Sequence, residues 1–151
     1  MLYQTFLFLH IVGVVAWMGG TFTLTVLNLR LAREPCAGSG QYLTRNGEFL
    51  GRSVFGPAIA LTLIAGIVMI GLAGWITPAW VIWGLCGLFA SGFIGAVFAS
   101  RAAKALARRL ADGDTESPTV HSLRRRLLLY ASLDLLILLS VVWAMVFKPA
   151  L

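Results

Sequence analysis

A histidine stands inside the apolar segment "LHIVGVVAWMGG", residues 9–20. A neutral imidazole is the commonest metal ligand among protein side chains, and an ionisable residue inside a membrane segment indicates a functional site. Spacings of three and four residues place three further residues on the same helical face: Gly13, Trp17 and Gly20. The glycines leave room for a flat group beside His10. We therefore expect a cofactor face here, and the structural alternative is a hydrogen bond from His10 to a neighbouring helix.

Two sulfur-containing side chains are expected at the depth of His10. A rise of about 1.5 Å per residue places Met69 and Cys86 within roughly 7–11 Å of the outer boundary, with Met145 nearer the surface. Met and Cys select Cu(I), and His with Met can ligate haem iron. The sequence thus allows a metal at His10, Met69 and Cys86, with haem b as the first candidate and copper as the alternative. His121 is expected in a cytoplasmic loop, which excludes bis-His haem ligation within one subunit.

Asp134, in "LLLYASLDLLILLS", is an acidic residue inside another apolar segment. We expect it about seven residues from the cytoplasmic end of its helix and roughly 10 Å from the level of His10, so a direct pair is not expected. Two roles are open. Asp134 can be a proton-relay element, or a buried, protonated acid that is hydrogen-bonded to Thr, Ser or Tyr groups on other helices.

The elements that position these residues are membrane-spanning helices. Of the 151 residues, 59% are hydrophobic and 12% are charged, against about 25% charged in soluble proteins, and the mean hydropathy is +0.87. A hydrocarbon core of about 30 Å needs about 20 apolar helical residues for each crossing. The predicted fold is an all-α, four-helix transmembrane bundle forming one integral membrane domain, residues 1–151. Its helices are predicted at residues 5–27, 54–76, 80–100 with an extension to about 111, and 127–147.

The distribution of basic residues predicts the topology of this bundle. The formal net charge is +6, and of the 12 Lys and Arg residues only Lys148 lies away from the first and third loops. The positive-inside rule makes loops 1 and 3 cytoplasmic and both termini periplasmic. The charge therefore reflects topology and argues against a nucleic-acid partner, although Arg124, Arg125 and Arg126 can also contact anionic lipid headgroups.

Small residues recur at every fourth position along the third predicted helix, at Gly87, Ser91, Gly95 and Ala99. In lipid, small residues allow the close backbone approach that brings helices together. The third helix is therefore expected at the centre of the bundle.

The segment "LHIVGVVAWMGGTFTLTVLNLRLA" resembles the first helix of the CopD-like superfamily through His10, Trp17, Gly19 and Gly20, and "VVWAMVFKP" is similar to the end of the fourth helix in its small members. That superfamily includes the copper-resistance D membrane domain, small bacterial four-helix proteins and HemJ-type protoporphyrinogen oxidases. The resemblance implies a multi-pass protein of the bacterial inner membrane, with His10 as the first-helix histidine implicated in haem or metal binding.

HemJ-type enzymes carry a Leu-Pro-Arg segment after the glycines and a lysine on a later helix. This chain has "TFTLTVLNLR" and no lysine within its third span, so the resemblance does not extend to protoporphyrinogen oxidation.

Three functions follow as hypotheses. The first is a small inner-membrane protein that binds haem, or copper, through an intramembrane histidine and serves in electron transfer or as an accessory subunit. The second is a structural or accessory subunit, without a cofactor, of a larger membrane complex. The third is a proton-coupled transporter that uses Asp134. The expected partners are the lipid bilayer and either a larger membrane complex or further copies of the chain, and the sequence leaves open whether the protein is an enzyme.

Overall fold

The computed structural model describes residues 1–33, 46–47, 49–74 and 78–148. Within these residues the secondary structure is helical and contains no strand. The elements are α1 (Leu2–Arg33), the π-helical segment η1 (Gly51–Phe55), α3 (Gly56–Ala73), α4 (Ala79–Phe93), the π-helical segment η2 (Ile94–Ala99), α5 (Ser100–Ala111) and α6 (Pro118–Phe147).

Among the described residues, four helices are long and apolar enough to cross a membrane. They are Leu2–Arg30, Ser53–Ala73, Ala79–Ala111 and Pro118–Phe147, so that α4, η2 and α5 together form the third. The predicted class, an all-α four-helix transmembrane bundle, is confirmed.

The helix ends follow local capping chemistry. α3 ends at Ala73 because Gly74 adopts a left-handed conformation, with φ of 65°, that glycine tolerates at a helix C-terminus. Residues 75 and 76 of the second predicted helix lie outside the described residues. α6 begins nine residues before the predicted start, at Pro118, where the Ser117 side chain accepts a hydrogen bond from the Val120 N–H. A serine cap followed by proline in the first turn is a strong start signal that hydropathy does not register.

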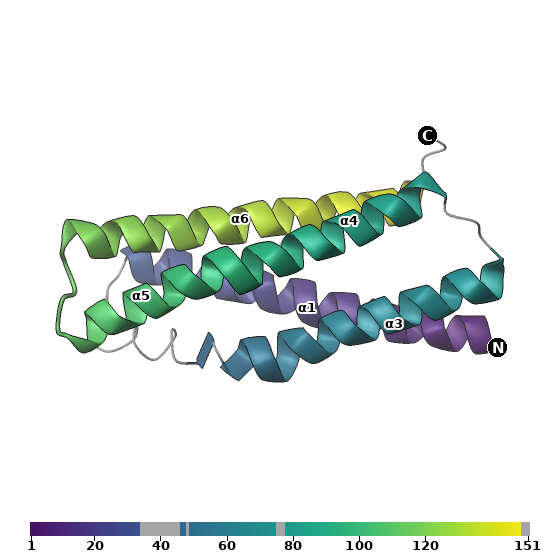
Figure 1. The fold of residues 1–151 in the computed structure, drawn as a ribbon, viewed down its shortest axis with the longest axis horizontal. Helices are drawn as coiled ribbons and strands as arrows, with labels where there is room; N and C mark the ends of the chain where they lie inside the picture. Colours follow the sequence, from purple (N-terminus) through teal and green to yellow (C-terminus); the bar gives the residue numbers. More distant parts are fainter. Residues whose placement is uncertain (34–45, 48, 75–77, 149–151) are drawn as a thin grey trace.

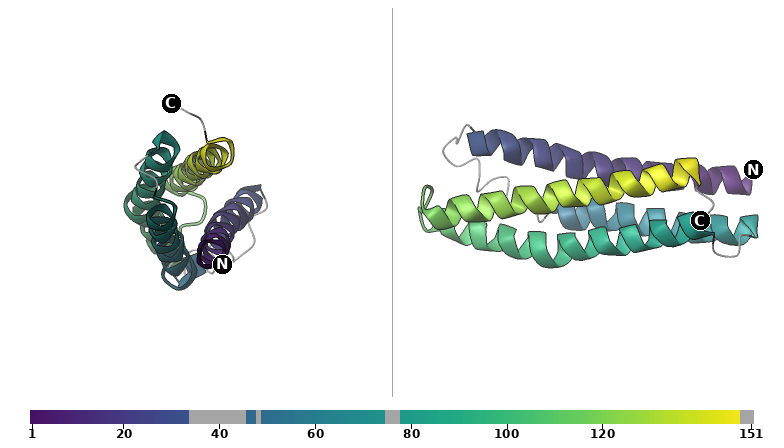
Figure 2. Two further views of the ribbon diagram at one scale, coloured as in Figure 1. Left: turned by 90° about the vertical axis from the view of Figure 1, so that its right-hand side faces the viewer. Right: turned by 90° about the horizontal axis from the view of Figure 1, so that it is seen from above.

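The four spans lie side by side with alternating direction, so that the N-terminus, the end of α3, the start of α4 and the end of α6 share one end of the bundle (Figure 1). We call this the terminal end. The opposite end holds the turn between α5 and α6. The view from above shows the same elongated arrangement, and the other view looks along the length of the bundle (Figure 2).

The helices pack as two pairs. α1 packs extensively on α3 and α4 packs on α6, while a further contact joins α1 to α6. In the described part of the chain α3 and α4 form no interface of comparable extent. The inner pair is therefore α1 and α6, and the expectation of a central third helix is wrong. The π-helical segment η2 interrupts the stripe of small residues, because Ser91 is buried whereas Gly95, within η2, is exposed.

The outer surface of the bundle is apolar, as a lipid-facing surface must be. Large hydrophobic side chains are exposed on all four spans, among them Phe8, Ile64, Phe89 and Leu136. The interior is thin by comparison and centres on Trp17, Ala58 and Leu138. Close packing between backbones therefore has to hold the helix pairs together.

Candidate functional site

A cavity of about 480 Å³ lies between the two helix pairs, toward the terminal end. Its walls come from α1, α3, α4 and α6 and are predominantly apolar. Its volume falls in the range of roughly 300–1,000 Å³ that is typical of small-molecule and cofactor sites.

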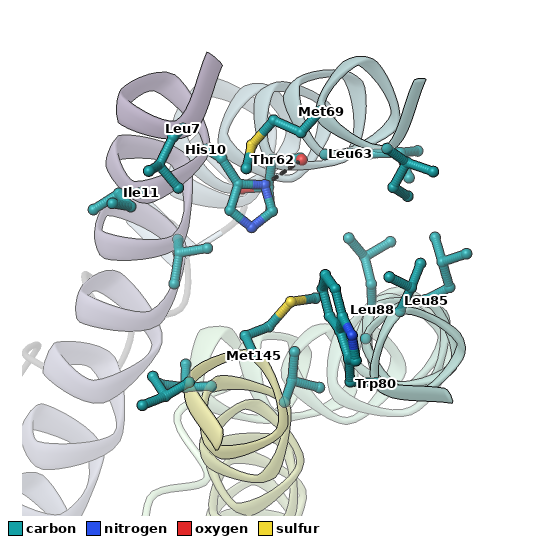
Figure 3. Close-up of a pocket in the computed structure, with 18 of the residues that line it drawn as sticks. Leu7, His10, Ile11, Thr62, Leu63, Met69, Trp80, Leu85, Leu88 and Met145 are labelled. Carbon is teal, nitrogen blue, oxygen red and sulfur yellow. Dashed lines mark hydrogen bonds between the residues drawn. The ribbon is translucent and has the colours of Figure 1, made fainter. Parts of the chain in front are cut away.

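His10 lines this cavity, with its ring against the α3 wall. Its Nδ1–H donates a hydrogen bond of 2.9 Å to the carbonyl oxygen of Thr62 on α3. A carbonyl oxygen can only accept, so Nδ1 carries the proton, and in the neutral ring Nε2 keeps its lone pair. Figure 3 shows the second ring nitrogen pointing away from α3 and into the space between the helix pairs. Metal-ligating histidines are usually oriented in this way, by a backbone carbonyl at the other nitrogen.

The wall behind the imidazole depends on small residues of α3. A Cβ atom placed on Gly66 would lie 3.4 Å from both Cε1 and Nδ1 of His10, so the ring rests directly against the α3 backbone. The Thr62 hydroxyl donates its own hydrogen bond of 2.8 Å to the Ala58 carbonyl oxygen. The Thr62 side chain is thus already satisfied, and its carbonyl oxygen is what orients His10.

The structure brings several of the predicted site residues together around His10. Trp17, which is 6% exposed, lines the inner end of the cavity and packs against Leu138. Met69 lies beside the imidazole on the α3 side, and Met145 lies across the cavity on α6 (Figure 3). One imidazole and two thioethers therefore face the same space.

The two glycines of the predicted cofactor face do not line the cavity. Gly13 faces Thr62 and Ala58 on α3, and Gly20 faces the ring of Phe55. On a helix these glycines lie roughly 60–80° around the axis from His10, which turns them toward α3 while His10 and Trp17 face the cavity. The space beside Gly13 and Gly20 is therefore filled by side chains and backbone of the neighbouring helices and not by the cavity.

Cys86 is also outside the cavity, and its side chain is exposed. The inward face of α4 consists of Val81, Gly84, Gly87 and Ser91. A step of about 100° from Gly87 turns Cys86 outward, although its depth is similar to that of His10. Among the described residues no group of three or more His, Cys, Asp or Glu side chains could hold a metal ion.

Asp134 lies midway along α6, away from His10. Its carboxyl group accepts a hydrogen bond from the hydroxyl of Ser91 on α4, and the two residues are 9% and 2% exposed. Ser91 entered the sequence analysis only as a small packing residue. Its role as the partner of Asp134 depends on how α4 and α6 pack, which the sequence alone does not encode.

The mouth of the cavity carries polar and aromatic residues that sequence reasoning did not assign to a site. Tyr3, Trp80 and Lys148 line it, and the Lys148 ammonium lies 5.5 Å from the centre of the Trp80 ring. Aromatic residues and cations are common anchors at a membrane boundary, so in the sequence these residues indicated where the helices end and not a binding site.

These features define a class of protein: a four-helix membrane protein with an imidazole facing an apolar cavity near one membrane boundary. Residues 4–149 match the family described as predicted integral membrane protein (DUF2269), and the chain belongs to that family. Neither the curated proteins nor the solved structures contain a significant match.

Proposed function

We propose that this membrane protein binds a b-type haem in the cavity through His10 and serves in electron transfer or as an accessory subunit. The observation that carries the proposal is the orientation of the imidazole, with Nδ1–H fixed by the Thr62 carbonyl and Nε2 directed into an apolar cavity of about 480 Å³. The resemblance of the first helix to CopD-like proteins supports the same role for His10. That resemblance also favours a bacterial inner membrane as the location.

The residues present fit a haem. The macrocycle is flat and apolar, which suits walls built from aliphatic side chains of four helices. Its two carboxylates are anionic, and Lys148 at the mouth supplies a cation at the membrane boundary. Met145 offers a thioether across the cavity from His10 (Figure 3). When bound, the haem would supply one-electron chemistry.

The protein's own residues would bind and orient such a group. The Thr62 carbonyl holds the imidazole in the tautomer that has a lone pair on Nε2. Gly66 leaves the ring seated against α3, and Trp17 closes the inner end of the cavity against water. The apolar walls lower the local dielectric, which strengthens each of the few polar contacts.

Copper is the second candidate, and a specific observation favours it. The two thioether groups of Met69 and Met145 lie on different sides of His10 in one cavity (Figure 3). Thioether and imidazole are suitable ligands for Cu(I). This set omits Cys86, because its side chain faces outward.

Optical spectroscopy of the purified protein tests the proposal. The protein, expressed with added haem precursor and purified in detergent, should show a Soret band that His10→Ala abolishes. Cys86→Ala is the matched control and should keep the full band, because Cys86 does not line the cavity. Replacement of Met145 by Leu should shift the band and leave haem bound if the Met145 thioether also holds the haem.

The remaining outcomes separate the alternatives. A colourless protein that binds one copper ion, and loses it in His10→Ala and Met69→Leu, would replace haem by copper. A colourless, metal-free protein whose unfolding does not change in His10→Ala would refute both cofactors. That result would favour a structural subunit of a larger membrane complex, which copurification from native membranes would identify.

A further inference from the structure

The carboxyl group of Asp134 is held in the interior of the bundle by one hydrogen bond. Ser91 on α4 donates that bond, and the structure records no other partner for Asp134 among the described residues. An ionised carboxylate at this depth in a bilayer is costly and is rare without a functional reason. A purely structural acid would be expected to satisfy both of its oxygens with hydrogen bonds.

The second oxygen of the Asp134 carboxyl group, Oδ2, is not fully enclosed by protein. In the described part of the chain, every side-chain nitrogen or oxygen that is fully buried has a hydrogen-bond partner. Ser91 bonds to Oδ1, so the unbonded Oδ2 must border accessible space. Oδ2 is therefore the carboxyl oxygen at which water, if it reaches this depth, would exchange a proton.

The pair lies just below the inner end of the cavity. Leu138 on α6 and Leu88 on α4 both line the cavity, and they lie one helical turn from Asp134 and Ser91 respectively. A charge that forms or disappears on Asp134 is therefore next to whatever the cavity holds.

Within the described ranges no basic group is paired with Asp134. The packed elements are α1, α4, η2 and α5, and η2 carries no titratable residue. By position along each helix, the nearest titratable side chains are His10 on α1, Cys86 on α4 and Arg101 on α5, with Tyr130 and Arg126 on α6 itself. His10 donates to Thr62, the Tyr130 ring contacts Phe98, and Cys86 is exposed.

We propose that Asp134 is a proton-exchange site one helical turn beyond the inner end of the cavity. The carboxylate takes a proton at Oδ2 from a hydronium ion, so that an O–H bond of the hydronium breaks, a water molecule is left and an O–H bond forms on Oδ2; release returns the proton to water. On release the electron pair stays on the oxygen, and the Ser91 hydroxyl donates to the charged carboxylate. The ligand of this site is the proton, and the site needs no cofactor in the cavity.

Infrared spectroscopy of the cofactor-free protein in lipid nanodiscs tests this proposal. Wild-type protein should show a protonated-carboxyl band that shifts in deuterated buffer and disappears as the buffer becomes alkaline. Asp134→Asn should remove this band, which assigns it. Ser91→Ala leaves the carboxyl group in place and should shift the same band, so the assignment does not depend on one variant folding. Asp112→Asn, in the α5–α6 turn, is the matched control and should keep the band.

Two results would overturn the proton-exchange site. One is an Asp134 band that stays unshifted after long incubation in deuterated buffer, which would make the carboxyl group a sealed structural element. The other is a band that exchanges but persists unchanged from acidic to alkaline buffer, which would show that its charge does not change. Because no haem is present, neither result depends on the cofactor proposal.

Discussion

Gly13 and Gly19, on the same helix as His10, face different surroundings. A Cβ atom on Gly13 would lie 2.9 Å from the Ala58 carbonyl oxygen, and backbone cannot move away as a flexible side chain can. A Cβ atom on Gly19 would meet no atom within 4 Å. The close approach of α1 to α3, and with it the hydrogen bond from His10 to Thr62, therefore depends on Gly13 in particular.

Gly13→Ala should destabilise the bundle by about 1–3 kcal/mol, the usual cost of overpacking. Gly19→Ala should be neutral or stabilising by up to about 1 kcal/mol, since alanine favours helix. Equilibrium unfolding in mixed micelles with increasing denaturing detergent measures both. Equal effects of the two substitutions would show that α1 does not rest on α3 at Gly13.

Helical periodicity and depth in the membrane, taken together, predicted cavity residues correctly. His10 and Trp17 share an azimuth, and both line the cavity with Met69. Cys86 was chosen by depth alone, and depth does not tell which way a side chain faces. The hydrogen bond from His10 to the Thr62 carbonyl could not be predicted from the sequence, because every residue type has a backbone carbonyl.

Among the elements, the turn between α5 and α6 is the clearest case of local chemistry that sets a boundary. Asp114 accepts hydrogen bonds from the Ser117 hydroxyl, at 2.7 Å, and from the Ser117 N–H, at 3.1 Å. These bonds, with the Arg109 guanidinium 3.9 Å away, lower the pKa of Asp114 below its ordinary value of 3.8. The folded turn therefore favours the carboxylate form.

Acid should weaken this turn. Because the folded pKa of Asp114 is depressed, its contribution to stability is fully present above pH 3.8 and is lost as the pH falls through the lower folded value. Protection of the amide hydrogens at the start of α6, taken relative to the exchange rate of an unstructured chain at the same pH, should fall in that acidic window for wild type. In Asp114→Asn this loss of protection should be absent, and Thr115→Ala, a neighbour in the turn, should behave as wild type.

The cap at Ser117 can be tested separately. Ser117→Ala removes the oxygen that accepts from the Val120 N–H at 3.3 Å, and with it the hydroxyl donor to Asp114. The expected cost is about 1 kcal/mol, with fraying confined to the first turns of α6. Hydrogen exchange that is unchanged at residues 119–122 would contradict this capping role.

The elements themselves were largely predictable, because long apolar runs in lipid have to be helical. The order in which the four helices pack against one another was not predictable. The π-helical segment η2 alters the helical register between Phe93 and Ser100, so residues spaced by four stop sharing a face. Hydropathy and spacing rules assume a regular helix and cannot anticipate such a change.

For the whole molecule, orientation in the membrane remains a prediction from charge. The basic residues near the α5–α6 turn should hold that end in the cytoplasm and leave the terminal end outside. In a bacterial host, alkaline phosphatase fused after Lys148 should be active, and a fusion after Asp112 should be inactive. The reverse pattern would invert the topology and place the His10 cavity near the cytoplasmic boundary.

The weak contact between α3 and α4 has a consequence for how the cavity is filled. With α1 and α6 holding the bundle together, the side between α3 and α4 faces hydrocarbon without a continuous helix interface. We therefore expect a hydrophobic guest to enter laterally from the bilayer, between α3 and α4, after the protein has been inserted and without unfolding it. Lipid acyl chains would compete for the same entrance between α3 and α4, so occupancy of the cavity should depend on the lipid in which the protein resides.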